Sequence, residues 1–124
     1  MAHANGARTA EAAAIAGIDS IEHGAYLDTD ALCAMKENGT VWVPTLSTIG
    51  NLRGKGRFHE DAVRAILESA LENVSAFARM GGLVALGSDA GAWAVPHGSI
   101  SEQQLLAQVG VDPEPGNQVI MEKF

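Results

Sequence analysis

Two histidines and one aspartate stand where short segments of the sequence end. Asp89 ends an apolar run that begins at Leu83, His23 comes directly before Gly24, and His3 lies in the opening Ala-His-Ala-Asn-Gly. A short apolar run bounded by glycine predicts a strand buried on both faces. The C-terminal ends of parallel strands meet at one edge, where ligands bind in α/β folds. Imidazole nitrogen and carboxylate oxygen are ligands of zinc, so the pattern predicts a divalent metal site.

A metal bound by His3, His23 and Asp89 would lower the pKa of a water molecule to about 7 and supply hydroxide at neutral pH. Asp89 could also act as the base that takes a proton from that water. Each residue alone has an ordinary interpretation, as a turn-satisfied histidine or a capping aspartate. Their equivalent places in successive units favour the metal site.

Other residues with chemical potential carry weaker signals. His97, in a Pro-His-Gly turn, could reach a substrate from the rim, and a solvent-exposed loop histidine is the alternative. Tyr26, Trp42 and Trp93 could line a pocket or belong to the core. Gly-Ser-Asp-Ala-Gly lacks the Gly-x-Ser-x-Gly order of a nucleophile elbow, which disfavours a serine hydrolase. Cys33, the single cysteine, excludes an intrachain disulfide and is expected to be inert.

The elements that must position these residues alternate between strand and helix. Strands are expected around His3 and at 18–23, 40–45 and 83–89. Helices are expected at 6–16, from a cap at Asp28 or Thr29 to residue 37, at 59–80 and at 101–109. A mobile loop is expected at 46–57, turns at 112–117, and a short helix or frayed tail at 118–124. Such alternation indicates βαβ units and a parallel sheet.

Length and composition limit the function classes. A chain of 124 residues makes one domain and supplies roughly half of a closed eight-stranded barrel, which needs about 250. A formal charge of -7, few scattered Lys and Arg, and 47% hydrophobic residues predict a soluble globular protein and argue against a nucleic-acid partner. No long apolar segment or secretory signal is present, so no membrane is expected and a cytoplasmic location is the default.

The ordered motifs resemble the C-terminal half of an amidohydrolase-superfamily enzyme, of the imidazolonepropionase-like and Xaa-Pro dipeptidase-like group. The resemblance spans about residues 2–110. Its motifs are, in order, Ala-His-Ala-Asn-Gly, Ala-Gly-Ile-Asp-Ser-Ile-Glu-His-Gly, Val-Pro-Thr, Gly-Ser-Asp-Ala-Gly and Pro-His-Gly.

The resemblance implies a (β/α)8 barrel, of which this chain would hold about the end of strand five to strand eight. It implies a metal-bound hydroxide that attacks an amide or lactam carbonyl. His3 resembles the metal ligand that ends strand five, and His23 resembles the one that ends strand six. Asp89 resembles the strand-eight aspartate that binds metal and shuttles a proton. His97 and Tyr26 resemble substrate contacts. The His-x-His pair of strand one and the strand-four lysine have no counterpart here.

Residues 1–124 are therefore expected to form a single half-barrel unit, with 111–124 as a divergent tail. The expected function is hydrolysis of the C–N bond of a dipeptide or cyclic amide with a divalent metal, zinc, as cofactor. The alternative is a non-catalytic structural or metal-binding remnant of such an enzyme. Because three or four strands leave open sheet edges, self-association of half-barrels is expected.

Overall fold

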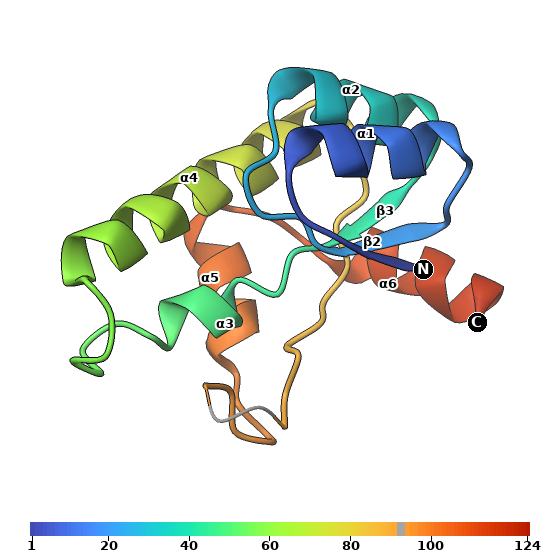
Figure 1. Ribbon diagram of the computed structural model, residues 1–124. Coiled ribbons are helices and arrows are strands. Elements are labelled where there is room, and N and C mark those ends of the chain that lie inside the picture. The colour runs from blue at the N-terminus through green and yellow to red at the C-terminus, as the bar shows by residue number, and fades with distance from the viewer. Residues whose placement is uncertain (92–93) are drawn as a thin grey trace.

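A parallel sheet lies at the centre of the computed structural model, which describes residues 1–91 and 94–124 (Figure 1). Within these residues the sheet has three strands in the order β1 (Ala2–Ala4), β2 (Ser20–His23) and β3 (Val41–Val43). β1 and β2 are parallel, as are β2 and β3. The predicted parallel α/β architecture is confirmed, and the C-terminal ends of all three strands point to the same edge of the sheet.

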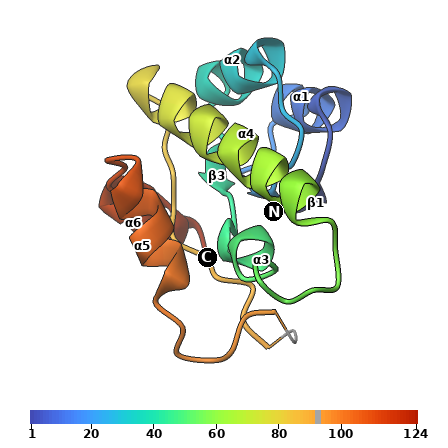
Figure 2. The same ribbon diagram turned by 90° about the vertical axis from the view of Figure 1, so that its left-hand side faces the viewer.

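Helices cover both faces of this sheet. Their bounds are α1 (Ala7–Ile15), α2 (Thr29–Glu37), α3 (Ser47–Gly50), α4 (Glu60–Arg79), α5 (Ser101–Gln108) and α6 (Glu114–Lys123). Figures 1 and 2 show α1, α2 and α4 on one face and α6 on the other. The Trp42 and Phe77 rings pack edge to face at the centre of the larger core, with centroids 5.7 Å apart.

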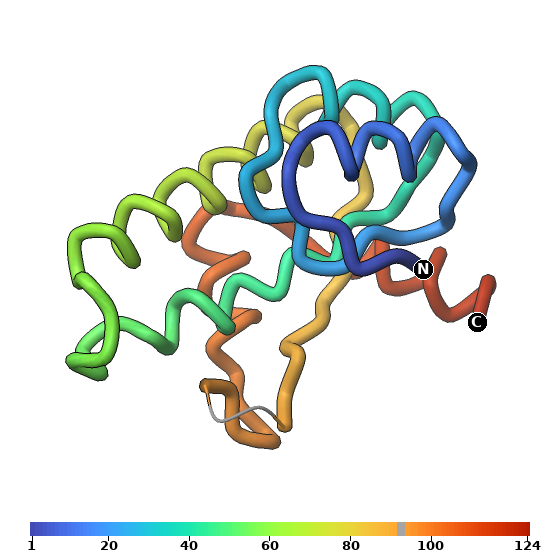
Figure 3. Tube along the Cα trace, in the orientation of Figure 1, coloured from blue at the N-terminus to red at the C-terminus, as the bar shows by residue number. Residues whose placement is uncertain are grey.

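The helix bounds agree with those predicted for α1, α2, α4 and α5 to within a few residues. Asp28 caps α2 as expected, because its side chain accepts a hydrogen bond from the backbone N–H of Ala31. The predicted loop at 46–57 is wrong in part, since its first residues form the short helix α3. Figure 3 shows the remainder of that segment as an irregular connection to α4. Trp93, a possible pocket residue, lies outside the described residues.

The strand predicted at 83–89 is much shorter than expected. Only one parallel bridge forms, between Trp42 and Val84, supported by hydrogen bonds from Trp42 N to Leu83 O and from Ala85 N to Trp42 O. Beyond Ala85, the backbone N–H of Leu86 donates to the Asn117 side chain instead. The next hydrogen bond of this ladder would run from the backbone N–H of residue 44 to Ala85 O, and Pro44 has no N–H to donate, so pairing with β3 stops there.

The turn predicted at 112–117 is also wrong, because α6 begins at Glu114 and includes most of that segment. Pro115 is tolerated in the first turn, where a helix does not use the missing N–H. α6 covers the outer edge of the 83–86 segment and packs Val119 and Ile120 against Val41, Val43 and Ala85. An ion pair between Lys123 and Asp19 fixes its far end to the start of β2. α6 thus shields one edge of the open sheet.

Gly116→Ala is expected to destabilise the protein by about 2 kcal/mol. A Cβ at this position would overlap the backbone carbonyl of Val84, and no side-chain rotation relieves that contact. The clash outweighs the gain of about 1 kcal/mol in helix propensity from glycine to alanine. Urea unfolding of this variant and of Gln118→Ala, an exposed change in the same helix, measures the effect. Equal stability of the two variants would show that α6 does not press on the 84–85 backbone.

Within the described residues, no helix combines the length and apolar character needed to cross a lipid bilayer.

Candidate active site

The C-terminal edge of the sheet carries a group of unusual backbone conformations. His23, Thr45 and Asp89 have φ angles of 66°, 48° and 53°, and Tyr26 has 61°, all in the left-handed region. In residues with a Cβ this conformation costs of order 1–3 kcal/mol each and persists only where the surrounding structure imposes it. Such residues cluster at functional sites. The unusual backbone conformations at the strand ends are therefore typical of a functional site.

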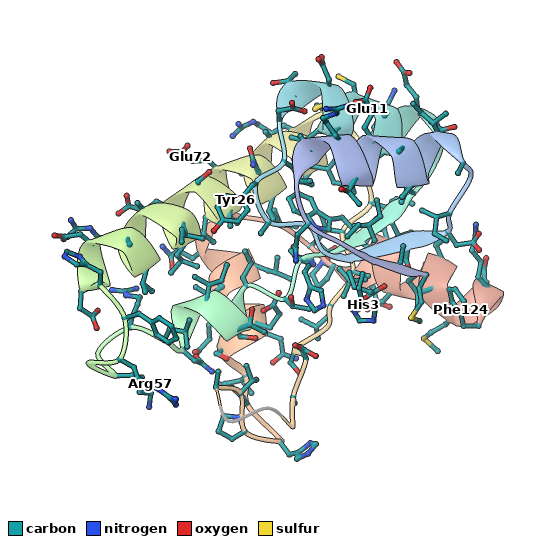
Figure 4. All side chains as sticks on the ribbon, in the orientation of Figure 1. His3, Glu11, Tyr26, Arg57, Glu72 and Phe124 are labelled. Carbon is teal, nitrogen blue, oxygen red and sulfur yellow. The ribbon has the colours of Figure 1, made fainter. Side chains whose placement is uncertain are left out.

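His3 and His23 meet at this edge. Nδ1 of His3 lies 2.8 Å from Nε2 of His23, and the ring centroids are 5.0 Å apart. His3 is on β1 and His23 ends β2, so the pair spans two neighbouring strands. His3 is exposed and His23 is half-buried; Figure 4 labels His3 on the side of the sheet where α6 lies. Two imidazole nitrogens thus point at one small volume that solvent can reach.

His23 is held on its other side by β3 and the residues after it. Its Nδ1 lies 2.8 Å from the hydroxyl oxygen of Thr45. Its backbone carbonyl accepts a hydrogen bond of 2.9 Å from the indole N–H of Trp42. Gly24 makes room for that indole, since a Cβ there would come within 2.6 Å of Trp42 Nε1. These contacts direct Nε2 of His23 toward His3.

A cavity of about 580 Å³ opens beside the strand ends. Its walls come from the loops after β1, β2 and β3, from α3, and from the first half of α4. Polar groups are few, and Asn5, His23, Thr45 and Asp89 are among them. The rest is largely apolar or aromatic, including Tyr26, Trp42, Leu46, Ile49, Leu52, Phe58, Val63 and Ile66. The cavity therefore suits a mainly apolar group next to a small polar end.

Glu102 holds one wall of this cavity in place. Its carboxylate, 2% exposed, accepts hydrogen bonds from the backbone N–H groups of Leu46 (3.0 Å) and Ser47 (2.7 Å). The Ser47 hydroxyl donates in turn to the carbonyl of Ser88, next to Asp89. Burial raises the pKa of Glu102, although the two N–H groups oppose that rise. This carboxylate thereby links α5, the start of α3 and the segment that carries Asp89.

The predicted site residues are brought together only in part. His3 and His23 are adjacent, and Asp89 and His23 line the same cavity. Within residues 1–91 and 94–124, however, no three His, Cys, Asp or Glu side chains are close enough to hold a metal ion. Tyr26 lies at the cavity wall, 68% exposed. His97 is exposed and does not belong to the described lining.

The histidine pair fits two positions of a zinc site. Zn–N bonds of about 2.0–2.1 Å in a tetrahedron place two ligand nitrogens about 3.3 Å apart. The observed 2.8 Å requires a separation of about half an ångström more. An exposed side chain such as His3 can make that movement. The third position would need Asp89, a carboxylate in the same cavity.

Several residues of the site were not predicted from the sequence. Thr45 contacts His23, and Asn5 joins two strand-end loops by accepting a hydrogen bond of 2.8 Å from the backbone N–H of Ala25. His59, expected at a helix start, also lines the cavity. The position of Thr45 just after a strand was a usable signal, equivalent to that of His23. Nothing in the local sequence marks His59 or Glu102.

Known proteins with similar sequences and structures give the chain a context. Uncharacterized proteins of Mycobacterium tuberculosis and Mycobacterium bovis are 37% identical over an alignment 99 residues long, which covers 75% of this chain and 26% of theirs. A solved Xaa-Pro dipeptidase with bound methionine in its active site has a TM-score of 0.72 and 29% identity, over 95% of this chain and 30% of its own. The ochratoxinase of A. niger has a TM-score of 0.73 and 28% identity, over 94% and 27%.

The chain spans about a quarter of the length of the curated relatives that it matches. No family model matches it. The two solved neighbours have amidohydrolase-like folds, and the likeness supports a distant relationship of this chain to hydrolases.

Proposed function

We propose that this chain carries part of the active site of a metal-dependent hydrolase that cleaves an amide C–N bond. The observation that carries the proposal is the meeting of His3 Nδ1 and His23 Nε2 at the C-terminal edge of a parallel sheet, beside a large cavity. That edge is where parallel α/β folds place their chemistry. The similarity to a dipeptidase and an ochratoxinase over nearly the whole chain supports the same conclusion.

His3 and His23 would hold the metal, zinc in this proposal, with Asp89 as the third ligand. When bound, the ion supplies an activated water and polarises the carbonyl that is attacked. Asp89 would in addition accept a proton from the attacking water and pass it to the leaving nitrogen, as a carboxylate within hydrogen-bond reach can do. Thr45 and Asn5 are further polar groups of the cavity that are available to orient the amide.

The cavity lining supports a substrate with an apolar side chain or ring next to the amide. Tyr26 and Phe58, both exposed in part, stand at the wall where such a group would enter. Burial of one large apolar side chain contributes about 1.5–3 kcal/mol to binding. Dipeptides and N-acyl amino acids with aliphatic or aromatic side chains are therefore the substrates to test. His97 stays a proposed contact from the rim.

We propose that the chain forms the half of a (β/α)8 barrel that runs from the end of strand five to strand eight. The outer edge of β1 has no partner strand within the described residues. A second copy of the chain that pairs there would cover this edge and could supply further ligands. Light scattering tests the idea, since a monodisperse monomer at high concentration would contradict self-association.

Hydrolysis assays test the proposed activity. The chain with zinc should release amino acids from an apolar dipeptide panel, lose that activity with a chelator, and regain it when zinc is restored. Asp89→Asn should lower the rate by about 100-fold, the lower range for loss of a proton-transfer group. Glu72→Gln, an exposed change on α4, is the control. A chain that stays silent on the whole panel with zinc present would favour the second candidate, a non-catalytic structural or metal-binding remnant. The incomplete ligand set of the described residues also favours such a remnant.

A further inference from the structure

We propose that Thr45 is a positioning residue for the metal site, whose hydroxyl holds the His23 imidazole with Nε2 facing His3. The inference rests on the proposed function in one respect, because the orientation of the ring affects function only if Nε2 binds a metal. The geometry itself stands on the 2.8 Å contact between Thr45 Oγ1 and His23 Nδ1.

The backbone around Thr45 fixes the hydroxyl in space. Thr45 is 4% exposed and has a φ of 48°, a costly conformation for a β-branched residue. Its carbonyl accepts hydrogen bonds from the backbone N–H (3.1 Å) and the hydroxyl (2.8 Å) of Thr48. The next two residues are bound through their N–H groups to Glu102. The backbone that carries the hydroxyl is therefore held by several hydrogen bonds.

A hydroxyl suits both protonation arrangements of His23. When Nε2 gives its lone pair to a metal, the ring proton must be on Nδ1, and Thr45 Oγ1 then accepts it. Without metal, the ring proton can lie on Nε2, toward His3, and the hydroxyl then donates to Nδ1. A hydroxyl both donates and accepts, so the contact persists in both states. A partner of this kind fixes the ring orientation of a metal-bound histidine and typically changes metal affinity 10–100-fold.

Trp42, on β3 shortly before Thr45, completes the arrangement. Its indole N–H holds the His23 carbonyl, while Thr45 holds the ring. Together they hold the backbone and the ring of His23, whose φ of 66° is unfavourable. The His23 side chain is thus ordered before a metal binds, which lowers the entropic cost of binding.

The test compares Thr45→Val, Thr45→Ser and Thr9→Val. Valine keeps the shape and the β-branch of threonine but cannot hydrogen-bond, serine keeps the hydroxyl, and Thr9 is an exposed residue of α1. Zinc affinity is measured by competition with a chromophoric chelator. We expect about 10–100-fold weaker binding for Thr45→Val, and binding within about threefold of wild type for the other two variants. Wild-type affinity in Thr45→Val would overturn the inference.

A second readout needs no metal and separates this inference from the proposed function. The mobility of the His23 ring is measured by ¹³C relaxation in the metal-free chain with labelled histidine. A ring that is rigid in wild type and in Thr45→Ser, and mobile in Thr45→Val, supports the positioning role even if the wild type binds no zinc. Absence of zinc binding by the wild type would contradict only the proposed metal site. Equal ring order in all variants would overturn the role of Thr45, and far-UV circular dichroism checks that each variant is folded.

Discussion

Replacing both His3 and His23 with alanine is expected to weaken zinc binding by about 10⁴-fold. Four-ligand protein sites bind zinc with about 10–16 kcal/mol, which is about 3 kcal/mol per ligand. Loss of two ligands then removes about 6 kcal/mol, and every 1.4 kcal/mol is a factor of ten. The two nitrogens that face each other at 2.8 Å would be gone together. The single variants are expected to lie between, because each keeps one of the two imidazole ligands.

The measurement is the zinc dissociation constant of the wild type, the two single variants and the double variant, at one pH and ionic strength. His97→Ala is the matched control, since it removes an exposed histidine that does not line the cavity. If the double variant and His97→Ala lose affinity equally, the histidine pair is not the metal site. If His23→Ala alone abolishes binding and His3→Ala has no effect, the pair is not shared by one ion.

The histidine pair could be predicted because its position follows from topology. In a parallel sheet, successive strands end at one edge, so residues that end adjacent strands must be close. His3 and His23 are adjacent provided that the short segments around them form successive strands of the sheet, and β1 and β2 do pair as neighbours. Local patterns such as the alanine-rich α1 and the Asp28 cap were sufficient to place the helices between them.

The surroundings of the pair could not be predicted, because they depend on contacts between distant parts of the chain. The segment expected as a strand at 83–89 has a helix as its outer neighbour, packed against it through Gly116 and Asn117. The wall of the cavity depends on Glu102, which is 55 residues from its partner Ser47. Polar residues in a helical pattern predict solvent exposure, and a glutamate that is 2% exposed contradicts that expectation.

Replacing Glu102 with alanine is expected to lower the free energy of unfolding by about 3 kcal/mol at neutral pH. Two buried N–H groups, of Leu46 and Ser47, would lose their acceptor, and each unsatisfied donor costs about 1–3 kcal/mol. Part of that cost is offset because a buried carboxylate no longer has to be desolvated. The start of α3 would loosen, and Thr45 and Asp89 would lose their support. Glu72→Ala, on the exposed side of α4, is the control.

Glu102→Gln tests the charge of this carboxyl group through the pH dependence of stability. Burial raises the pKa of Glu102 in the folded protein above its ordinary value of 4.5. Between that value and the raised pKa, the folded state binds more protons than the unfolded state, so the stability contributed by this group is full at low pH and falls as pH rises. Glutamine does not titrate. The free energy of unfolding of the wild type minus that of Glu102→Gln should therefore decrease as pH increases through this window. Urea unfolding of both proteins at a series of pH values, from below 4.5 up to neutral pH, measures the difference. A difference that grows with pH would show that the two backbone N–H groups outweigh burial and that the carboxylate is held in its charged form.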